Sequence, residues 1–159
     1  MATVGKHKIL VLCTGNSARS QIAEAFLKKF GSERFDVRSA GTDPKGVNPL
    51  TVRVMNEIGI DLSEARSKHL NEFLGHWSAQ IVLIVCNDAD KACPAVWPGV
   101  LERLVWPFED PARATGSEEE RLEVFRRVRD EISARIKSWI AALPRDYMPG
   151  AKLTSKTSA

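Results

Sequence analysis

The sequence predicts a single three-layer α/β domain, in which a central four-stranded parallel sheet carries helices on both faces. Short apolar runs alternate with stretches whose apolar residues recur at helical spacing. The chain has 159 residues, a length that suits one domain with a substantial core. Its 43% hydrophobic and 27% charged residues are also ordinary for a globular protein, so the composition supports this fold class.

The first half of the chain predicts two strands, each followed by a helix. Residues 8–12 form an apolar run typical of a buried strand, and residues 20–30 carry apolar side chains on one helical face. A second strand is predicted over residues 35–40. After a loop that contains glycine and proline, Pro49 favours the first turn of a helix that ends at Gly59.

The second half predicts two more strands and the longest helix. Residues 79–85 contain a continuous apolar run typical of a central parallel strand, and residues 101–106 form a shorter last strand. A short helix is predicted before these strands, over residues 67–74. A capping-box pattern begins at Ser117 and predicts a helix that runs to Leu143.

Domain organisation and charge limit the possible functions. We expect one domain over residues 1–143 and a flexible polar tail over residues 144–159. The net charge of +3 is spread along the chain and is too weak to indicate nucleic-acid binding. No apolar run approaches the ~20 residues of a membrane-spanning helix, and the N-terminus lacks a signal-peptide pattern. Three cysteines are an odd number, so we expect a cytoplasmic protein whose thiols serve chemistry rather than structural bridges.

One segment places a nucleophile beneath an anion-binding loop, at the junction of the first strand and the first helix. It consists of Cys13, Thr14, Gly15, Asn16, Ser17, Ala18, Arg19 and Ser20. A helix N-terminus offers unpaired N–H groups and a partial positive charge, which bind a tetrahedral anion and favour a thiolate at Cys13. Arg19 adds a permanently charged fork that matches two oxygens. We therefore expect residues 14–20 to bind an oxyanion above the sulfur.

The small and polar residues of this loop fit the same interpretation. Gly15 and Asn16 favour left-handed backbone angles, and Ser17 and Ser20 offer hydroxyl donors to the loop or to the sulfur. The segment is not a nucleotide P-loop, because no Gly-Lys-Ser/Thr follows, and its single glycine excludes a dinucleotide fingerprint. The plain alternative is a buried core thiol at Cys13 with the arginine on a solvated helix face.

Two further cysteines, Cys86 and Cys93, follow the central apolar strand. On a regular helix their Cα atoms would lie roughly 10 Å apart, beyond the ~4.4–6.8 Å that a disulfide spans. A bridge would therefore require the segment to bend or unwind. Two alternatives stay open: a metal site, for which the neighbouring sequence offers too few ligands, and a pair of unrelated core thiols.

Asp110 is the candidate general acid. It lies in the loop after the last predicted strand, and the carboxyl ends of parallel strands meet at one edge of a sheet. Its carboxyl group could therefore protonate a leaving oxygen above Cys13, although Asp-Pro pairs are also common in ordinary turns. Glu109 is expected to be solvated, and the three histidines form no cluster in the sequence.

Together these motifs resemble those of the thioredoxin-coupled arsenate reductases, which share the low-molecular-weight protein tyrosine phosphatase fold. The resemblance covers residues 8–143. Residues 13–20 resemble the family's anion loop, and residues 106–112 resemble its acid loop. The segment that resembles its redox segment contains Cys86, Asp88, Asp90, Cys93 and Pro94.

The resemblance implies a relay of three thiols. Cys13 would attack arsenate while Arg19 and the loop amides hold its oxygens, and Asp110 would protonate the departing oxygen. Cys86 would then attack the sulfur of Cys13 and release arsenite. Cys93 would move the disulfide to the Cys86–Cys93 pair, which thioredoxin would reduce. We also expect a monomer without a bound cofactor, with phosphate and sulfate as competing oxyanions and with no nucleic-acid or membrane partner.

The chain departs from some relatives at two positions. Ala18 stands where some of them have an extra cysteine, a change that leaves the relay intact. Some also bind potassium beside the anion loop, with ligands that resemble Asn16, Glu24 and Ser39 and an acidic residue that aligns with Lys68. Because a lysine does not ligate a cation, we expect no metal site and expect the Lys68 ammonium in that place.

Two other functions use parts of the same residue set. A phosphatase acting on phosphotyrosine or small phosphate esters would use the same nucleophile, arginine and acid, with water as the second nucleophile. It would leave the two later cysteines without a role, and Ala112 and Arg113 stand where aryl phosphatases of this fold usually carry aromatic residues. A thiol sensor or arsenite-binding module would use the cysteines but not the anion loop.

Overall fold

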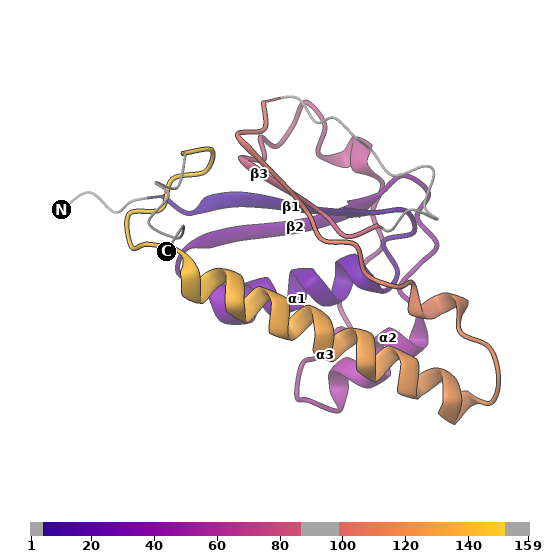
Figure 1. Cartoon of the computed structure of the whole chain (residues 1–159). Coiled ribbons are helices and arrows are strands. Elements are labelled where there is room, and N and C mark those ends of the chain that lie inside the picture. Colours follow the sequence, from indigo (N-terminus) through magenta and orange to yellow (C-terminus); the bar gives the residue numbers. More distant parts are fainter. Residues whose placement is uncertain (1–4, 87–98, 152–159) are drawn as a thin grey trace.

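The computed structural model describes residues 5–86 and 99–151, and it confirms the predicted four-stranded parallel sheet, whose strand order is β2-β1-β3-β4 (Figure 1). The elements in chain order are β1 (His7–Cys13), α1 (Arg19–Gly31), β2 (Phe35–Gly41), α2 (Pro49–Asn56), the 3-10 turn η1 (Leu70–Glu72), β3 (Ile81–Ile84), β4 (Glu102–Val105), the 3-10 turn η2 (Pro111–Arg113) and α3 (Glu118–Ala142).

Strand β1 is the centre of the core, because β2 pairs with one of its edges and β3 with the other. In this register Ile9 lies opposite Val37 of β2 and Ile81 of β3. The four residues from Ile9 to Leu12 are all buried. A strand covered on both faces needs apolar side chains at every position rather than at alternate ones. This explains why the sequence shows a continuous apolar run there.

Helical segments cover both faces of the sheet. Helices α1, α2 and α3 lie on the face below the sheet in Figure 1, where Phe35 of β2 stacks on Trp139 of α3 with ring centroids 5.3 Å apart. On the opposite face, Lys8 and Arg38 lie over the ring of Trp77, which follows η1. The short helix predicted over residues 67–74 is therefore present as a 3-10 turn.

Helix α2 ends earlier than predicted, at Asn56 rather than at Gly59. Gly59 has φ +83°, and the N–H of the next residue, Ile60, donates to the carbonyl of Met55 at 3.0 Å. This left-handed glycine closes the helix by binding a carbonyl of its last turn. Gly59 thus lies beyond the C-cap residue Glu57, in the turn that stops the helix.

Residues 144–151 pack against the domain, which the prediction of a flexible tail from residue 144 onward did not anticipate. Tyr147 is buried, its ring meets Trp139 edge-on at 6.1 Å, and its hydroxyl donates to Glu102 at 2.8 Å. The N–H of Gly150 binds the same carboxylate at 3.0 Å. The tail thereby covers one end of β4, while residues 152–159 lie outside the described part of the chain.

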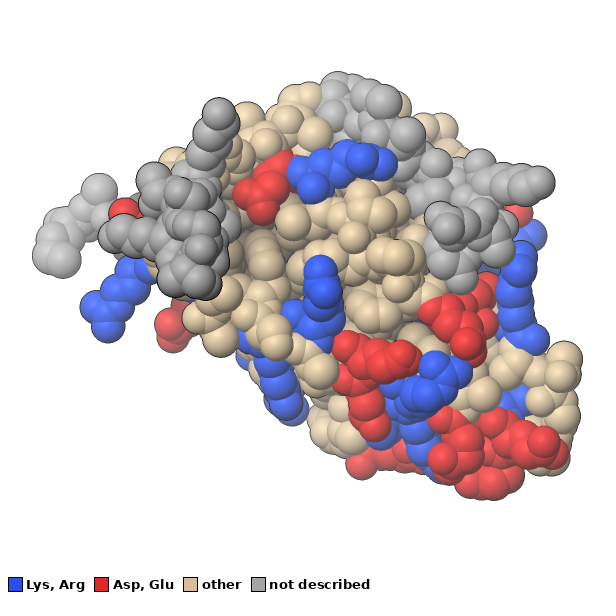
Figure 2. Space-filling view, in the orientation of Figure 1, with Lys and Arg blue, Asp and Glu red and all other residues tan. Residues whose placement is uncertain are grey.

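The helical face carries a dense set of ion pairs. Figure 2 shows acidic and basic side chains interleaved over the first half of α3. At its centre Arg126 contacts Glu57 at the end of α2 (2.7 Å) and two carboxylates of α3, Glu119 (2.9 Å) and Glu123 (2.5 Å). Such exposed pairs each stabilise little, but this one joins α2 to α3. Within the described ranges, no helix combines the length and apolarity that crossing a membrane requires.

Candidate active site

Cys13, Arg19 and Asp110 meet at the carboxyl edge of the sheet, where they line a cavity of about 400 Å³ together with part of the anion loop. Cys13 is the last residue of β1, and the anion loop runs from it to the start of α1 at Arg19. Residues 45–49, from the loop after β2, and the acid loop before α3 form the rest of the cavity wall. The edge location predicted from the parallel sheet is therefore confirmed.

The anion loop bends at Asn16, which has φ +47° and sends its N–H to the sulfur of Cys13 at 3.2 Å. The expectation of left-handed backbone is confirmed at this residue and is wrong for Gly15, which is not among the described glycines with positive φ. Gly15 is instead closely approached by a side chain from the loop after β2. A Cβ atom there would lie 3.3 Å from the side chain of Lys45, which crosses over the loop.

Donors outside the loop hold its carbonyl groups. Three backbone N–H groups after β2 bind them: Asp43 to Thr14 (2.9 Å), Lys45 to Gly15 (3.0 Å) and Asn48 to Ser17 (3.0 Å). Because a peptide N–H points opposite to its carbonyl, carbonyls engaged on the outside of the loop leave N–H groups directed toward its concave side. That arrangement suits the oxygens of a bound anion.

Gln21 is a site residue that sequence reasoning missed. Its buried amide donates to the carbonyl of Asn16 at 3.1 Å, to the Asn16 side-chain oxygen at 3.0 Å and to the carbonyl of Arg66 at 3.0 Å. It therefore holds the bend of the loop and joins it to the segment before η1. The available signal was a polar amide in the first turn of the helix, directly before the apolar residues Ile22 and Ala23.

The thiol of Cys13 is 2% exposed, and its sulfur lies 2.8 Å from the hydroxyl oxygen of Ser20. The side-chain amide of Asn16 donates to Ser20 at 2.8 Å and to Ser39 at 2.9 Å. Since the Ser20 oxygen accepts from Asn16, its own hydrogen is free to point at the sulfur. The predicted hydroxyl donor is thus Ser20, an arrangement that suits a thiolate.

Ser39 continues this network to Glu24, where the ammonium group of Lys68 was expected in place of a metal ion. Ser39 donates to Glu24, and Lys68 places its Nζ 3.8 Å from the same carboxylate oxygen. Lys28 pairs with the other oxygen at 2.5 Å. Burial lowers the pKa of the Lys68 ammonium, and the charge of Glu24 opposes that shift. The Lys68 backbone N–H also donates a hydrogen bond to the Asn16 side-chain oxygen at 2.8 Å.

These residues do not fit a potassium site. An ammonium stands where an acidic ligand would be needed, and the Asn16 oxygen is already bound by two donors. A lysine offers no lone pair to a cation when it is charged. The expectation that the Lys68 ammonium takes this place is confirmed by its ion pair with Glu24.

Arg19 links the anion loop to the acid loop. Its buried guanidinium lies 3.6 Å from Asp110 and donates to the carbonyl of Phe108 at 3.3 Å. Asp110 accepts the N–H of Ala112 at 3.0 Å and so caps η2 with one carboxylate oxygen. The predicted acid is therefore beside the pocket, while neighbouring Glu109 is at the surface and pairs with Arg127 at 2.7 Å.

Cys86 lies two residues beyond the end of β3, the strand that pairs with β1. It is buried, its sulfur takes part in a disulfide, and it lies 3.9 Å from the carbonyl oxygen of Leu12. Cys13, in contrast, is a free thiol. The rest of the predicted redox segment, which comprises Asp88, Asp90, Cys93 and Pro94, lies outside the described residues.

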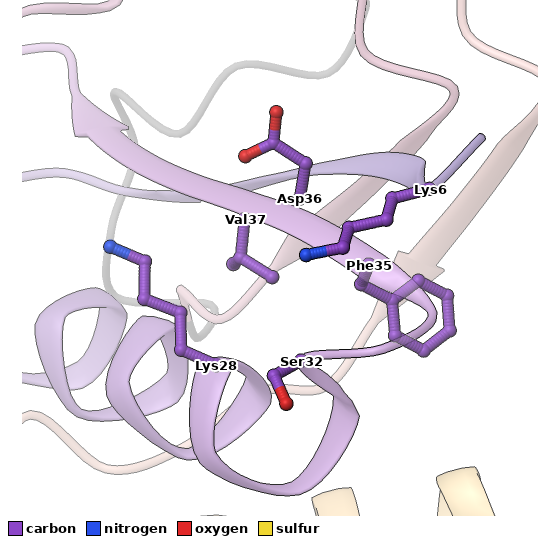
Figure 3. Close-up of a pocket in the computed structure, with 6 residues that line it drawn as sticks. All are labelled: Lys6, Lys28, Ser32, Phe35, Asp36 and Val37. Carbon is purple, nitrogen blue, oxygen red and sulfur yellow. The ribbon is translucent and has the colours of Figure 1, made fainter.

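A second cavity, of about 500 Å³, lies at the other end of β2 (Figure 3). It is lined by Lys6, Lys28, Ser32, Phe35, Asp36 and Val37. Figure 3 shows the Lys6 side chain reaching across β2, while the ammonium of Lys28 is directed away from it. This cavity lies at the amino end of β2, and no cysteine is among the described residues that line it, so it is separate from the carboxyl-edge site.

Comparisons with known proteins identify the relatives of this chain. Residues 8–148 match the family described as low molecular weight phosphotyrosine protein phosphatase. An arsenate reductase of Halalkalibacterium halodurans is 48% identical over 136 residues, which are 86% of this chain and 96% of the relative.

Two solved structures extend the comparison. An arsenate reductase in the phosphate binding state superposes with a TM-score of 0.71 at 32% identity, over 85% of this chain and 97% of the other. A thioredoxin-dependent arsenate reductase of Corynebacterium glutamicum gives a TM-score of 0.62 at 27% identity, over 88% of this chain and 63% of the other. The chain therefore belongs to the low molecular weight phosphotyrosine protein phosphatase family and, within it, to the arsenate reductases.

Proposed function

We propose that this protein reduces arsenate to arsenite in the cytoplasm, through Cys13, Cys86 and Cys93, with thioredoxin as the electron donor. One observation carries the proposal. The cysteine beneath the anion loop is a free thiol, while a second cysteine at the end of the neighbouring strand takes part in a disulfide. A phosphatase needs only the first of these, whereas a reductase that stores oxidation in the protein needs both.

In the first step the thiolate of Cys13 attacks arsenic. The loop N–H groups and Arg19 hold the arsenate oxygens, and Asp110 gives its proton to the oxygen that leaves as water. The 3.6 Å between Arg19 and Asp110 is long for a hydrogen-bonded pair, so the guanidinium can turn toward the anion and release the carboxyl group. The product is an adduct with a sulfur–arsenic bond, in which arsenic is still pentavalent.

In the second step the thiolate of Cys86 attacks the sulfur of Cys13. The electron pair of the sulfur–arsenic bond passes to arsenic, which leaves as trivalent arsenite, and a Cys13–Cys86 disulfide forms. Leu12 lies opposite Ile84 in the sheet, so regular alternation would point residues 13 and 86 to opposite faces. Strand β3 ends at Ile84, so Cys86 lies outside the regular strand and its side chain need not follow this alternation. We propose that the backbone after Val85 shifts and brings the two sulfurs together.

In the third step Cys93 attacks Cys86, and the Cys13 thiolate is regenerated. Cys86 is only 4% exposed, so a protein reductant could not reach its sulfur directly. A third cysteine that accepts the disulfide at the surface removes this obstacle. Thioredoxin then supplies two electrons through its own dithiol. All electrons pass between sulfur atoms, so no bound cofactor is required.

The test is arsenate-dependent NADPH oxidation with thioredoxin and thioredoxin reductase, for wild type and the three Cys→Ser variants. We expect multiple turnover in wild type, none in Cys13→Ser, and about one arsenite per chain in Cys93→Ser, which should accumulate a Cys13–Cys86 disulfide seen by mass spectrometry of peptides. Phosphate affinity, which needs neither later cysteine, serves as the control for folding of Cys86→Ser and Cys93→Ser. Sustained turnover by Cys93→Ser would disprove the relay even if arsenate is the substrate.

A phosphatase acting on small esters or phosphotyrosine is the second candidate, because Cys13, Arg19 and Asp110 suit the same in-line attack on phosphorus. Among the described residues that line the cavity none is aromatic, so an aryl group would find no ring to pack against. We expect p-nitrophenyl phosphate to be hydrolysed far more slowly than arsenate is reduced. The reverse order of rates would favour the phosphatase.

A further inference from the structure

Two cationic side chains lie at the active-site cavity without belonging to the anion loop. They are Lys45, from the loop after β2, and Arg113, from the acid loop. We call this pair the cationic rim. The anion loop binds the oxygens of one tetrahedral group, and none of the steps derived above uses either rim residue.

The Arg113 position is fixed relative to the acid. Asp110 and Arg113 stand at the two ends of η2, where the Arg113 N–H donates to the Asp110 carbonyl at 3.1 Å and the Asp110 carboxylate binds the N–H of Ala112. A single turn therefore carries both the carboxyl group and the guanidinium, and any movement of the acid loop moves them together.

The Arg113 charge is also uncompensated. Within residues 5–86 and 99–151, no carboxylate lies at ion-pair distance from its exposed guanidinium. Lys45 differs, because its Nζ lies 2.8 Å from Asp43. The stem of Lys45 crosses over Gly15, while its side chain stays 65% exposed. Arg113 thus contributes a full positive charge at the cavity and Lys45 a partly balanced one.

These charges matter because the cavity also contains a carboxylate. Asp110, when ionised, repels an entering anion, and Arg19 beside it is already in contact with that carboxylate. A tetrahedral oxyanion such as phosphate carries about −1.5 to −2 charge near neutral pH. Arg113 lines the same cavity and is carried on the same turn as Asp110, so its positive charge opposes this repulsion.

We infer that the cationic rim, and Arg113 above all, raises the affinity of the site for doubly charged tetrahedral oxyanions and so helps them reach Cys13. With respect to arsenate the inference rests on the proposed function. Arg113 acts through charge on binding and not on the chemical steps. Substituting Arg113 should therefore change the KM for arsenate and the affinity for phosphate. This effect should become smaller as salt screens the charge.

The experiment compares Arg113→Ala, Arg113→Lys and Lys45→Ala with a matched control, Arg145→Ala. Arg145 is also exposed but follows α3, a helix of 25 residues that separates it from η2 by about 37 Å. At low ionic strength we expect Arg113→Ala to weaken phosphate binding, measured by calorimetry, by roughly fivefold and to raise the KM for arsenate by the same factor. This is the effect of removing a unit charge that lies several ångströms from a dianion in water. We expect kcat to stay within about twofold, Lys45→Ala to show a smaller effect, and Arg113→Lys to recover most of the affinity.

The salt dependence and the constant that changes separate the outcomes. At about 0.5 M salt the difference between Arg113→Ala and wild type should shrink to less than twofold. Arg113→Ala that binds phosphate as tightly as Arg145→Ala at low salt would overturn the inference. A fall in kcat with unchanged KM would overturn it too, because Arg113 would then act in the chemistry. Phosphate calorimetry needs no reduction, so a weakened Kd without any arsenite formation would uphold the rim and reject the proposed function instead.

Discussion

The substitution Gly41→Ala should remove oxyanion binding while leaving the fold in place. Gly41 is the last residue of β2, paired with Cys13, and it lies directly beneath the anion loop. A Cβ atom there would overlap the carbonyl oxygen of Thr14 and come within 3.0 Å of the Asn16 nitrogen. Both contacts are backbone atoms, which cannot rotate away as a side chain would. The loop itself must therefore move.

The size of the effect follows from this overlap. Restoring ordinary contact requires a shift of the loop of about 1 Å, and a misplacement of this size costs roughly 100-fold in rate, or about 2.7 kcal/mol. Overpacking by one methyl group costs about 1–3 kcal/mol of stability. For a chain of this length that lowers the melting temperature by roughly 2–10 °C. A Gly41→Ala protein that stays folded should thus still lose about two orders of magnitude in activity.

The assay pairs arsenate reduction and phosphate calorimetry with thermal unfolding. Gly5→Ala is the matched control, because a Cβ atom at Gly5 meets nothing within 4 Å, and it should behave as wild type in all three measurements. A folded Gly41→Ala protein with the phosphate affinity and the kcat/KM of wild type would refute the claim that backbone packing beneath the loop sets its shape.

Three further changes test other parts of the structure. Ser20→Ala removes the hydroxyl that faces the sulfur, so alkylation of Cys13 by iodoacetamide at neutral pH should slow by roughly fivefold; an unchanged rate would exclude Ser20 as a donor to the thiolate. Lys68→Asp should make arsenate reduction depend on potassium, and equal activity in potassium and tetramethylammonium salts would contradict the assignment of the Lys68 ammonium as the resident cation. Burial, with the hydrogen bond to Glu102, raises the pKa of Tyr147, so the native state keeps a proton that the unfolded chain loses above about pH 10. The stability advantage of wild type over Tyr147→Phe should therefore be complete at about pH 8 and decline above about pH 10 in urea unfolding, and a constant difference would show that Tyr147 does not retain its proton.

Local patterns made the sheet and the nucleophile predictable. The apolar runs that became β1 and β3 are continuous because these strands are covered on both faces, and that pattern is visible without knowledge of their partners. Cys13, Arg19 and Ser20 were found because one strand, one loop and one helix start place them together. Because these residues are close in the sequence as well as in space, their spacing in the sequence was enough to predict that they form one site.

The supports of the loop were not predictable in this way. Asp43 and Asn48 bind the loop through backbone N–H groups, which every residue other than proline possesses, so their identities carry no signal. Gln21 and Gly41 matter only because the fold brings other backbone segments against them. The packing of residues 144–151 was missed for a similar reason, since Tyr147 acquires its contacts only after α3 has docked on the sheet.

The two sides of the site differ in how firmly the chain holds them. Cys13 ends a strand that is paired on both edges, and the loop after it is bound by N–H groups of the β2–α2 connection and by Gln21. Cys86 lies two residues past the end of β3, beyond the regular ladder. A thiol relay needs this asymmetry, because the attacked sulfur must stay beneath its oxyanion while the attacking sulfur comes to it. If both sulfurs were fixed in the sheet, alternation would keep them on opposite faces; if both could move freely, the oxyanion pocket would lose its shape.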